Sequence, residues 1–157
     1  MLWRIFGVGP TGAGISLLML GAMVWLDRIM GQPQLTGSGT IPVVAGCVLV
    51  VVGAVLHVLV FKNLTRWWVD GELCTRGPFG WCRHPMYAAW IGCIAPGIAL
   101  AFNSWVVLFW PLAIRPAWHL LVSREEKAIR ARFGAAYDEY AAVTPRFFPR
   151  WNRLRGD

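Results

Sequence analysis

The chain has 157 residues, of which 57% are hydrophobic and only 15% charged, and it carries 10 tryptophans. This composition excludes an ordinary soluble domain and indicates one membrane domain over residues 1–157. The net charge of +7 is explained by basic residues that flank membrane spans and face anionic lipid headgroups, so we do not predict nucleic-acid binding.

Four apolar segments are predicted to be transmembrane helices. About 20 apolar residues cross the hydrocarbon layer, and the segments are residues 12–30, 41–61, 85–102 and 104–123. The first is too long for a signal peptide, so we retain it as a span. The short turn at 102–104 favours an antiparallel hairpin, although Pro96, Pro111 and Pro116 interrupt the last two segments. The sequence therefore predicts an all-α, integral-membrane helical bundle of about four transmembrane helices.

The distribution of basic residues predicts the orientation. With the N-terminus in the cytoplasm, every Lys and Arg except Arg28 and Arg115 falls in or next to a cytoplasmic segment. Cytoplasmic loops of membrane proteins carry an excess of Lys and Arg. We therefore expect a multi-pass protein of the cell (inner) membrane, with both termini in the cytoplasm.

A polar, turn-rich segment at 77–87 separates the second and third spans. Pro78 and Pro85 fix the backbone there, so we expect a rigid loop that carries Arg83 and His84 and a helix that begins at Pro85. The cysteines show no metal-like spacing, and we predict neither a disulfide nor a metal site. His57, near the inner end of the second span, is interpreted as a packed or interfacial residue.

The fourth span carries a polar stripe. Arg115, His119, Val122 and Glu126 follow one another at spacings of four, three and four, which places them on one helix face. We interpret this face as one wall of a cavity that leads to the cytoplasmic end, where Arg124, Glu125 and Glu126 cluster. The alternative is a helix on which Arg115 extends toward the headgroups without any cavity.

The C-terminal part is predicted to form a cytoplasmic amphipathic helix over residues 125–140. Ile129, Phe133 and Tyr137 recur at spacings of four, which is typical of a helix that lies at the membrane surface or over the mouth of the bundle. We expect Gly134 to kink this helix. The proline-fixed tail at 143–149 is long enough to fold back as a cover.

The charged groups at the predicted cytoplasmic face suit a zwitterionic ligand that bears an aromatic ring. Arg83 or His84 is able to hold a carboxylate, and Glu125 or Glu126 an ammonium or a ribose diol. Aromatic rings are able to face a sulfonium cation. The chain lacks the dinucleotide-binding, phosphate-loop, zinc-protease and nucleophile-elbow motifs, which excludes the common soluble cofactor folds.

These residues carry a family resemblance over residues 75–150. The run is Gly77-Pro78-Phe79-Gly80-Trp81-Cys82-Arg83-His84-Pro85-Met86-Tyr87, followed by Glu125-Glu126, Arg132-Phe133-Gly134, Tyr137, Glu139-Tyr140 and Pro145. It resembles the isoprenylcysteine carboxyl methyltransferase and phospholipid N-methyltransferase superfamily. The family often has Gly where this chain has Ala89, which affects helix approach there. Residues 1–74, a variable helical pair, resemble nothing specific.

The resemblance implies S-adenosylmethionine as cofactor and methyl transfer to a lipophilic or prenylated substrate that enters from the bilayer. Its cofactor-binding positions correspond to Arg83, His84, Tyr87, Glu125 and Glu126. The residues single out no catalytic base. Arg115 or Arg124 is a candidate to pair with a carboxylate nucleophile, and His119 or Glu126 to accept a proton from an amine.

Two other classes stay open on the sequence. One is an NADPH-dependent membrane reductase of the sterol-reductase kind, against which the acidic pair argues. The other is a non-enzymatic membrane scaffold or transporter subunit. The methyl acceptor, the methylated atom and the oligomeric state are not predicted.

Overall fold

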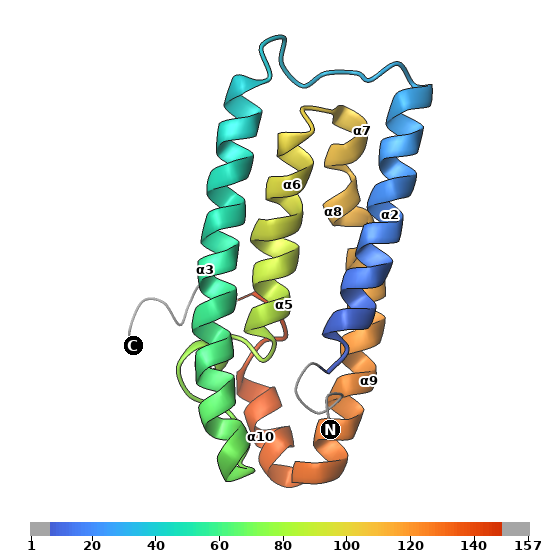
Figure 1. Cartoon of the computed structure of the whole chain (residues 1–157). Coiled ribbons are helices and arrows are strands. Elements are labelled where there is room, and N and C mark those ends of the chain that lie inside the picture. The colour runs from blue at the N-terminus through green and yellow to red at the C-terminus, as the bar shows by residue number, and fades with distance from the viewer. Residues whose placement is uncertain (1–6, 149–157) are drawn as a thin grey trace.

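The computed structural model describes residues 7–148, except for the side chains of residues 65–70, and it is an all-α bundle without β-strands in this range (Figure 1). Three helical segments are long and apolar enough to cross a membrane, namely Gly9–Ile29, Thr40–Leu64 and Trp105–Phe133, and a shorter apolar segment covers Pro85–Ala101. The predicted all-α membrane bundle is confirmed.

Helix α3 (Thr40–Asp70) extends beyond the predicted second span. The second apolar segment led us to expect the helix to end near residue 61. No glycine or proline interrupts residues 62–70, so the helix continues until Gly71, which adopts a left-handed conformation with φ of 70°. Glycine is the usual residue for this type of helix end.

The third predicted span consists of three consecutive pieces. Helix α5 (Pro85–Ala89) continues into the π-helix η1 (Trp90–Ile94) and then into α6 (Ala95–Ala101). This segment packs on α3 at a glycine contact, where a Cβ atom on Gly46 would lie 2.4 Å from the Gly97 carbonyl oxygen. Two backbones approach this closely only where both residues lack side chains.

The fourth predicted span and the amphipathic helix form one stack. Helices α7 (Trp105–Leu108) and α8 (Trp110–Ala113) are short, and α9 (Arg115–Phe133) then runs without a break through residue 125. The expectation of a separate helix that begins at Glu125 is wrong, because nothing near that residue ends α9. The predicted kink at Gly134 is confirmed: its φ is 55°, and α10 (Ala135–Val143) leaves in a new direction.

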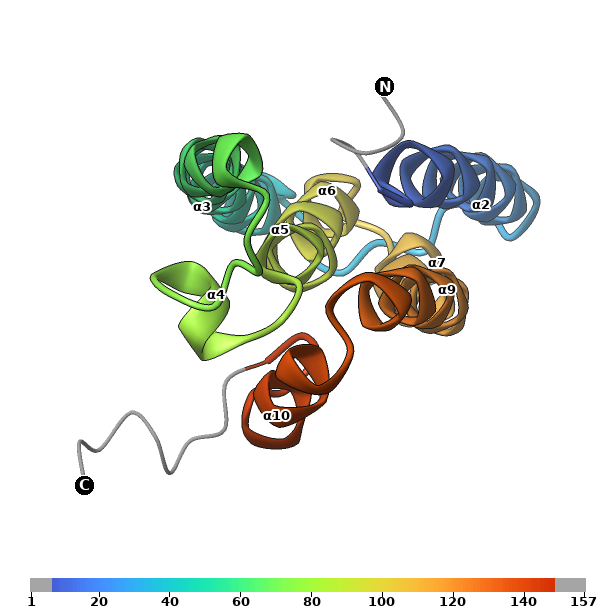
Figure 2. The same ribbon diagram turned by 90° about the horizontal axis from the view of Figure 1, so that it is seen from below.

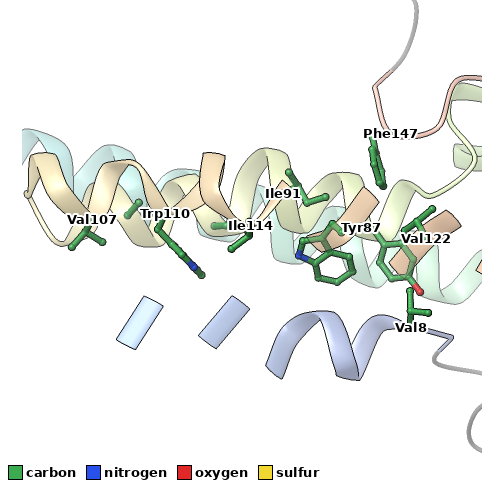
Figure 3. Packing of buried hydrophobic residues seen from close by; sticks show 11 residues of the cluster. Val8, Tyr87, Ile91, Val107, Trp110, Ile114, Val122 and Phe147 are labelled. Carbon is green, nitrogen blue, oxygen red and sulfur yellow. The ribbon is translucent and has the colours of Figure 1, made fainter. Parts of the chain in front are cut away.

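The two halves of the bundle meet along a core of aromatic and aliphatic side chains. Helix α2 (Gly9–Ile29) packs against α7, α8 and α9, whereas α3 packs against α5, η1 and α6 (Figure 2). The core includes Trp110, Ile114, Trp118 and Val122 (Figure 3). The Trp110 and Trp118 indole N–H groups donate to the Ser16 carbonyl oxygen at 2.8 Å and to its hydroxyl at 3.0 Å.

The two ends of the bundle differ in structure. One end carries the loop after α2 and the turn at 102–104, where the Ser104 side chain accepts hydrogen bonds from the first amides of α7 and donates to buried Asp27. The start of α2, residues 71–84 and α10 gather at the other end, which we call the α10 end (Figure 1). The polar residues of the predicted site lie there.

Candidate functional site

The loop before α5 is held by the C-terminal segment. After one helical turn, α4 (Pro78–Trp81), the backbone N–H groups of Arg83 and His84 donate to the carbonyl oxygens of Pro145 at 2.8 Å and Arg146 at 3.0 Å. The expectation that the tail folds back is confirmed as far as residue 148; Pro149 lies outside the described residues. The segment at 77–87, which we expected to be a rigid loop, begins with the helical turn α4.

Glu126 is the centre of an ion-pair network at the back of the site. Its Oε1 atom accepts from Arg83 Nε at 2.9 Å and from His84 Nε2 at 3.2 Å, and its Oε2 atom accepts from Arg146 Nη2. Glu126 and His84 are buried. A buried carboxylate needs such partners to offset its lost hydration. Three predicted cofactor-binding residues therefore contact one another.

Arg146 was missed by sequence reasoning. It donates to Glu126 and also to the Ser123 hydroxyl at 3.1 Å, and so connects the tail to α9. Arg83 strengthens the same connection, because its Nη1 atom donates to the carbonyl oxygens of Ala141 and Thr144. Only the expected fold-back of the tail pointed to this region, and no spacing in the sequence singled out Arg146.

Glu125 faces the opposite way and is held by different partners. Its Oε2 atom accepts from the Tyr87 hydroxyl at 2.9 Å and from the Val8 backbone N–H at 3.1 Å, while Oε1 lies 4.0 Å from His84 Nδ1. The Tyr87 hydroxyl is directed toward Val8 (Figure 3). The start of α2 thereby joins the loop and α9.

Gly7 makes this approach possible. Its φ is 50°, and a Cβ atom there would lie 2.7 Å from Glu125 Oε2 and 2.9 Å from the Tyr87 hydroxyl. A glycine tolerates both the left-handed backbone and the lack of space. The glycine-rich start of the first span was a signal in the sequence, but nothing related it to Glu125.

A cavity of about 880 Å³ lies at the α10 end. Its size falls in the range of about 300–1,000 Å³ that is typical of small-molecule sites. Arg83, His84, Tyr87, Arg124 and Glu125 line it. Further lining residues come from the start of α2, from α3, from α5 and η1, and from α9 and α10, and include Thr11, His57, Trp90, Trp118, Ile129 and Tyr137.

Arg115 and His119 lie outside the cavity, and both are exposed. The Arg115 guanidinium lies 5.8 Å from the centre of the Phe148 ring, and the His119 ring packs edge-on against Phe147 at 4.9 Å. The interpretation of their helix face as a cavity wall is wrong, because the C-terminal segment packs on that face. Glu126 lies behind the cavity rather than on its lining.

Burial keeps several titratable groups near the cavity neutral. It raises the pKa of Tyr137 to about 12, with a further contribution from the nearby Glu126 charge, and the Tyr137 hydroxyl makes no hydrogen bond of normal geometry in the described structure. Burial also raises the pKa of the Cys74 and Cys82 thiols to about 11. Within residues 7–148, no group of three or more His, Cys, Asp or Glu is placed to hold a metal ion.

Two curated proteins resemble part of this chain. The nickel-cobalt-cadmium resistance protein NccN of Alcaligenes xylosoxydans xylosoxydans is 35% identical over 98 residues, which cover 55% of this chain and 40% of that protein. The cobalt-zinc-cadmium resistance protein CzcN of Cupriavidus metallidurans is 33% identical over 89 residues, which cover 56% of this chain and 40% of that protein. The chain thus spans less than half the length of these relatives.

No solved structure matches the chain. The family model of the phospholipid methyltransferases matches residues 41–136, which begin in α3 and end in α10. This range starts earlier than the resemblance at 75–150 and contains Arg83, Tyr87 and both glutamates of the candidate site. The match covers more than half of the chain, and the protein therefore belongs to the phospholipid methyltransferase family.

Proposed function

We propose that the protein is an S-adenosylmethionine-dependent integral-membrane methyltransferase that acts on a lipophilic or prenylated substrate. One observation carries the proposal: the two segments that resemble the methyltransferase motif meet on the wall of the cavity, where the Tyr87 hydroxyl donates to Glu125 at 2.9 Å. Membership of the phospholipid methyltransferase family supports the same reaction class.

The cavity lining fits the functional groups of the cofactor. Glu125 Oε1 accepts none of the hydrogen bonds found for that carboxylate, and so is available to an ammonium or a ribose diol. Arg124 on the same wall is a cation for a carboxylate. Tyr87, Trp90 and Trp118 give the lining aromatic surface, which suits adenine and a sulfonium. When bound, S-adenosylmethionine supplies an electrophilic methyl group.

In this proposal, the ion pairs with Glu126 hold two side chains of the cavity lining in position, those of Arg83 and His84. Arg83 and His84 line the cavity on one side and contact Glu126 on the other. The network fixes their side chains before a ligand binds, so less side-chain conformational entropy is lost on binding. Glu126 acts on the ligand only through these two residues.

The arrangement of α2 and α3 supports substrate access from the bilayer. The two helices lie on different sides of α5 and α6 (Figure 2), yet Thr11 and Ala13 of α2 and His57 and Leu64 of α3 all line the cavity. A lipophilic substrate is able to reach a cavity with such a wall without crossing water. We propose that the α10 end faces the cytoplasm, where S-adenosylmethionine is made, and that the membrane is the inner membrane.

Calorimetric titration of the detergent-purified full chain with S-adenosylhomocysteine tests the proposal. We expect saturable binding that Glu125→Gln weakens at least tenfold. Glu139→Gln is the matched control, because Glu139 is exposed on α10 and does not line the cavity. Binding of NADPH in place of S-adenosylhomocysteine would favour the reductase, and binding of neither would favour the scaffold. Unchanged activity in Arg115→Ala is expected from its position outside the cavity.

A further inference from the structure

His57 lies where the cavity reaches toward the membrane interior. It belongs to the spanning part of α3, and its imidazole lies against the backbone of Met86 on α5. Both residues line the cavity. The Nδ1 atom is buried and has no hydrogen-bond partner among the described residues. A buried imidazole nitrogen without a partner loses its hydration uncompensated, which is unfavourable and uncommon in folded proteins.

Trp90, which lines the same cavity, presents the same feature. It is the first residue of the π-helix η1, follows α5, and lines the same cavity. Its indole N–H is also buried without a partner in the described structure. Single π-turns occur frequently at functional sites. Two unsatisfied polar groups on facing helices, at one cavity, indicate a subsite for a polar group that enters with a ligand.

Among the other ionisable side chains of the lining, Tyr137 also lacks a hydrogen-bond partner in the described structure, but it lies on α10 and burial raises its pKa to about 12. The remaining ones have partners or are exposed. Tyr87 and Glu125 bind each other, and Arg83 and His84 bind Glu126. The Tyr140 hydroxyl donates to the Phe79 carbonyl oxygen at 2.6 Å. Arg132 donates to the Gly71 carbonyl oxygen, and Glu72 is exposed. His57 is therefore a lining imidazole that belongs to no ion pair within the described residues.

We propose that His57 and Trp90 bind the polar head of the methyl acceptor, and that His57 accepts its proton. The inference rests on the proposed function and narrows its substrate class to a lipophilic molecule with an uncharged O–H or S–H nucleophile. The Trp90 N–H donates to the nucleophilic atom. The proton of that atom would pass to the imidazole, and the electron pair left on oxygen or sulfur would form the new bond to the methyl carbon. The pair of the broken methyl–sulfonium bond would stay on the sulfur of the departing S-adenosylhomocysteine.

The surroundings of His57 disfavour a charged acceptor. Met86, whose backbone lies against His57, is apolar, and the indole of Trp90 adds apolar surface to the same cavity. A carboxylate against these side chains would lose its hydration, whereas a neutral hydroxyl or thiol loses far less. Arg115, a candidate partner for a carboxylate, lies outside the cavity.

Nitrogen NMR of the full chain in lipid nanodiscs tests the subsite directly. The chain has three histidines, so ¹⁵N-histidine labelling gives few imidazole signals, and His57→Gln assigns those of His57. With S-adenosylhomocysteine present, we expect decanol and decanethiol to shift the His57 Nδ1 signal and decane to leave it unchanged. Trp90→Phe, which keeps an aromatic ring and removes the N–H, is expected to reduce the shift.

Two further measurements complete the test. His57→Gln should keep the affinity for S-adenosylhomocysteine within twofold and lower methyl transfer to decanol or decanethiol by about 10²–10⁴-fold, the usual contribution of a proton acceptor. If neither decanol nor decanethiol shifts the His57 Nδ1 signal, or if decanoate shifts it instead, the inference is overturned and the proposed function stays intact. Failure of the wild-type chain to bind S-adenosylhomocysteine overturns both.

Discussion

Substitution of Gly7 by alanine isolates the contact between the start of α2 and the candidate site. The new Cβ atom would lie 2.7 Å from Glu125 Oε2 and 2.9 Å from the Tyr87 hydroxyl. Both atoms belong to the hydrogen bond at the cavity wall, so the added methyl group acts directly on that bond. We expect the segment at Gly7 and Val8 to move away from Glu125, because α9 and α5 are fixed in the core.

The size of the effect follows from two costs. Alanine at a φ of 50° is less favourable than glycine by about 1–2 kcal/mol. Loss of the Val8 N–H bond to Glu125 costs about 1.5 kcal/mol, the low end for a charged acceptor, because the Glu125 side chain is 22% exposed. Ligand binding must restore this contact, so about 2.5–3.5 kcal/mol corresponds to roughly 60- to 300-fold weaker binding.

Titration of S-adenosylhomocysteine into the wild-type protein, Gly7→Ala and Gly9→Ala measures this effect. Gly9 is a close control, because a Cβ atom there would lie 3.5 Å from the Tyr87 ring, an ordinary contact, and its φ is not positive. We expect Gly9→Ala to bind within twofold of wild type and both variants to melt within a few degrees of it. Equal affinity for Gly7→Ala and Gly9→Ala would refute the role of the α2 start in holding Glu125.

Three further predictions concern packing, charge and thiol chemistry. A Cβ atom on Gly12 would lie 2.5 Å from the Trp118 ring, whereas none of the surroundings of Gly14 comes within 4 Å, so Gly12→Ala should melt well below wild type and Gly14→Ala at or above it. Glu126→Gln should lower the free energy of unfolding by about 2–3 kcal/mol, measured by chemical denaturation, because it removes the negative charge that contacts Arg83, His84 and Arg146. Burial raises the pKa of the Cys82 thiol to about 11. Because only the thiolate reacts, Cys82 should be alkylated slowly at pH 8 and faster as the pH approaches 11. Rapid labelling of Cys82 at pH 8 in the folded protein would contradict its burial.

The sequence was sufficient to predict the membrane bundle because the bilayer restricts the possible structures. Apolar runs of the required length must be helical, since lipid offers no partner to an exposed backbone. One local signal was interpreted correctly, because Gly134 turns the chain into α10, whereas the end of α3 at Gly71 lies well beyond the predicted end of that span. The continuity of α9 through residue 125 was missed, because the change from apolar to polar composition does not by itself end a helix.

The candidate site was predictable only for side chains that share a helix or a motif. Val8 contributes a backbone N–H, which any residue would supply, and therefore leaves no trace in residue type. Arg146 reaches Glu126 from a segment without helical period. Arg115 and His119 were placed on the correct helix face, but periodicity does not tell which neighbour packs on that face, and here it is Phe147 and Phe148.

The adjacent residues Glu125 and Glu126 are not one acidic pair in the physical sense. Successive side chains of an α-helix point about 100° apart, so neighbours meet largely different partners, and here His84 lies within 4.0 Å of both glutamates. Glu125 consequently meets Tyr87 and the start of α2 at the cavity, and Glu126 meets Arg83, His84 and the tail behind it. The loop at 83–87 touches both, through His84 on one side and Tyr87 on the other. A ligand that binds at Glu125 therefore contacts a cavity wall whose position depends on the start of α2, on the loop and on the tail together. These three segments close over the same end of α9.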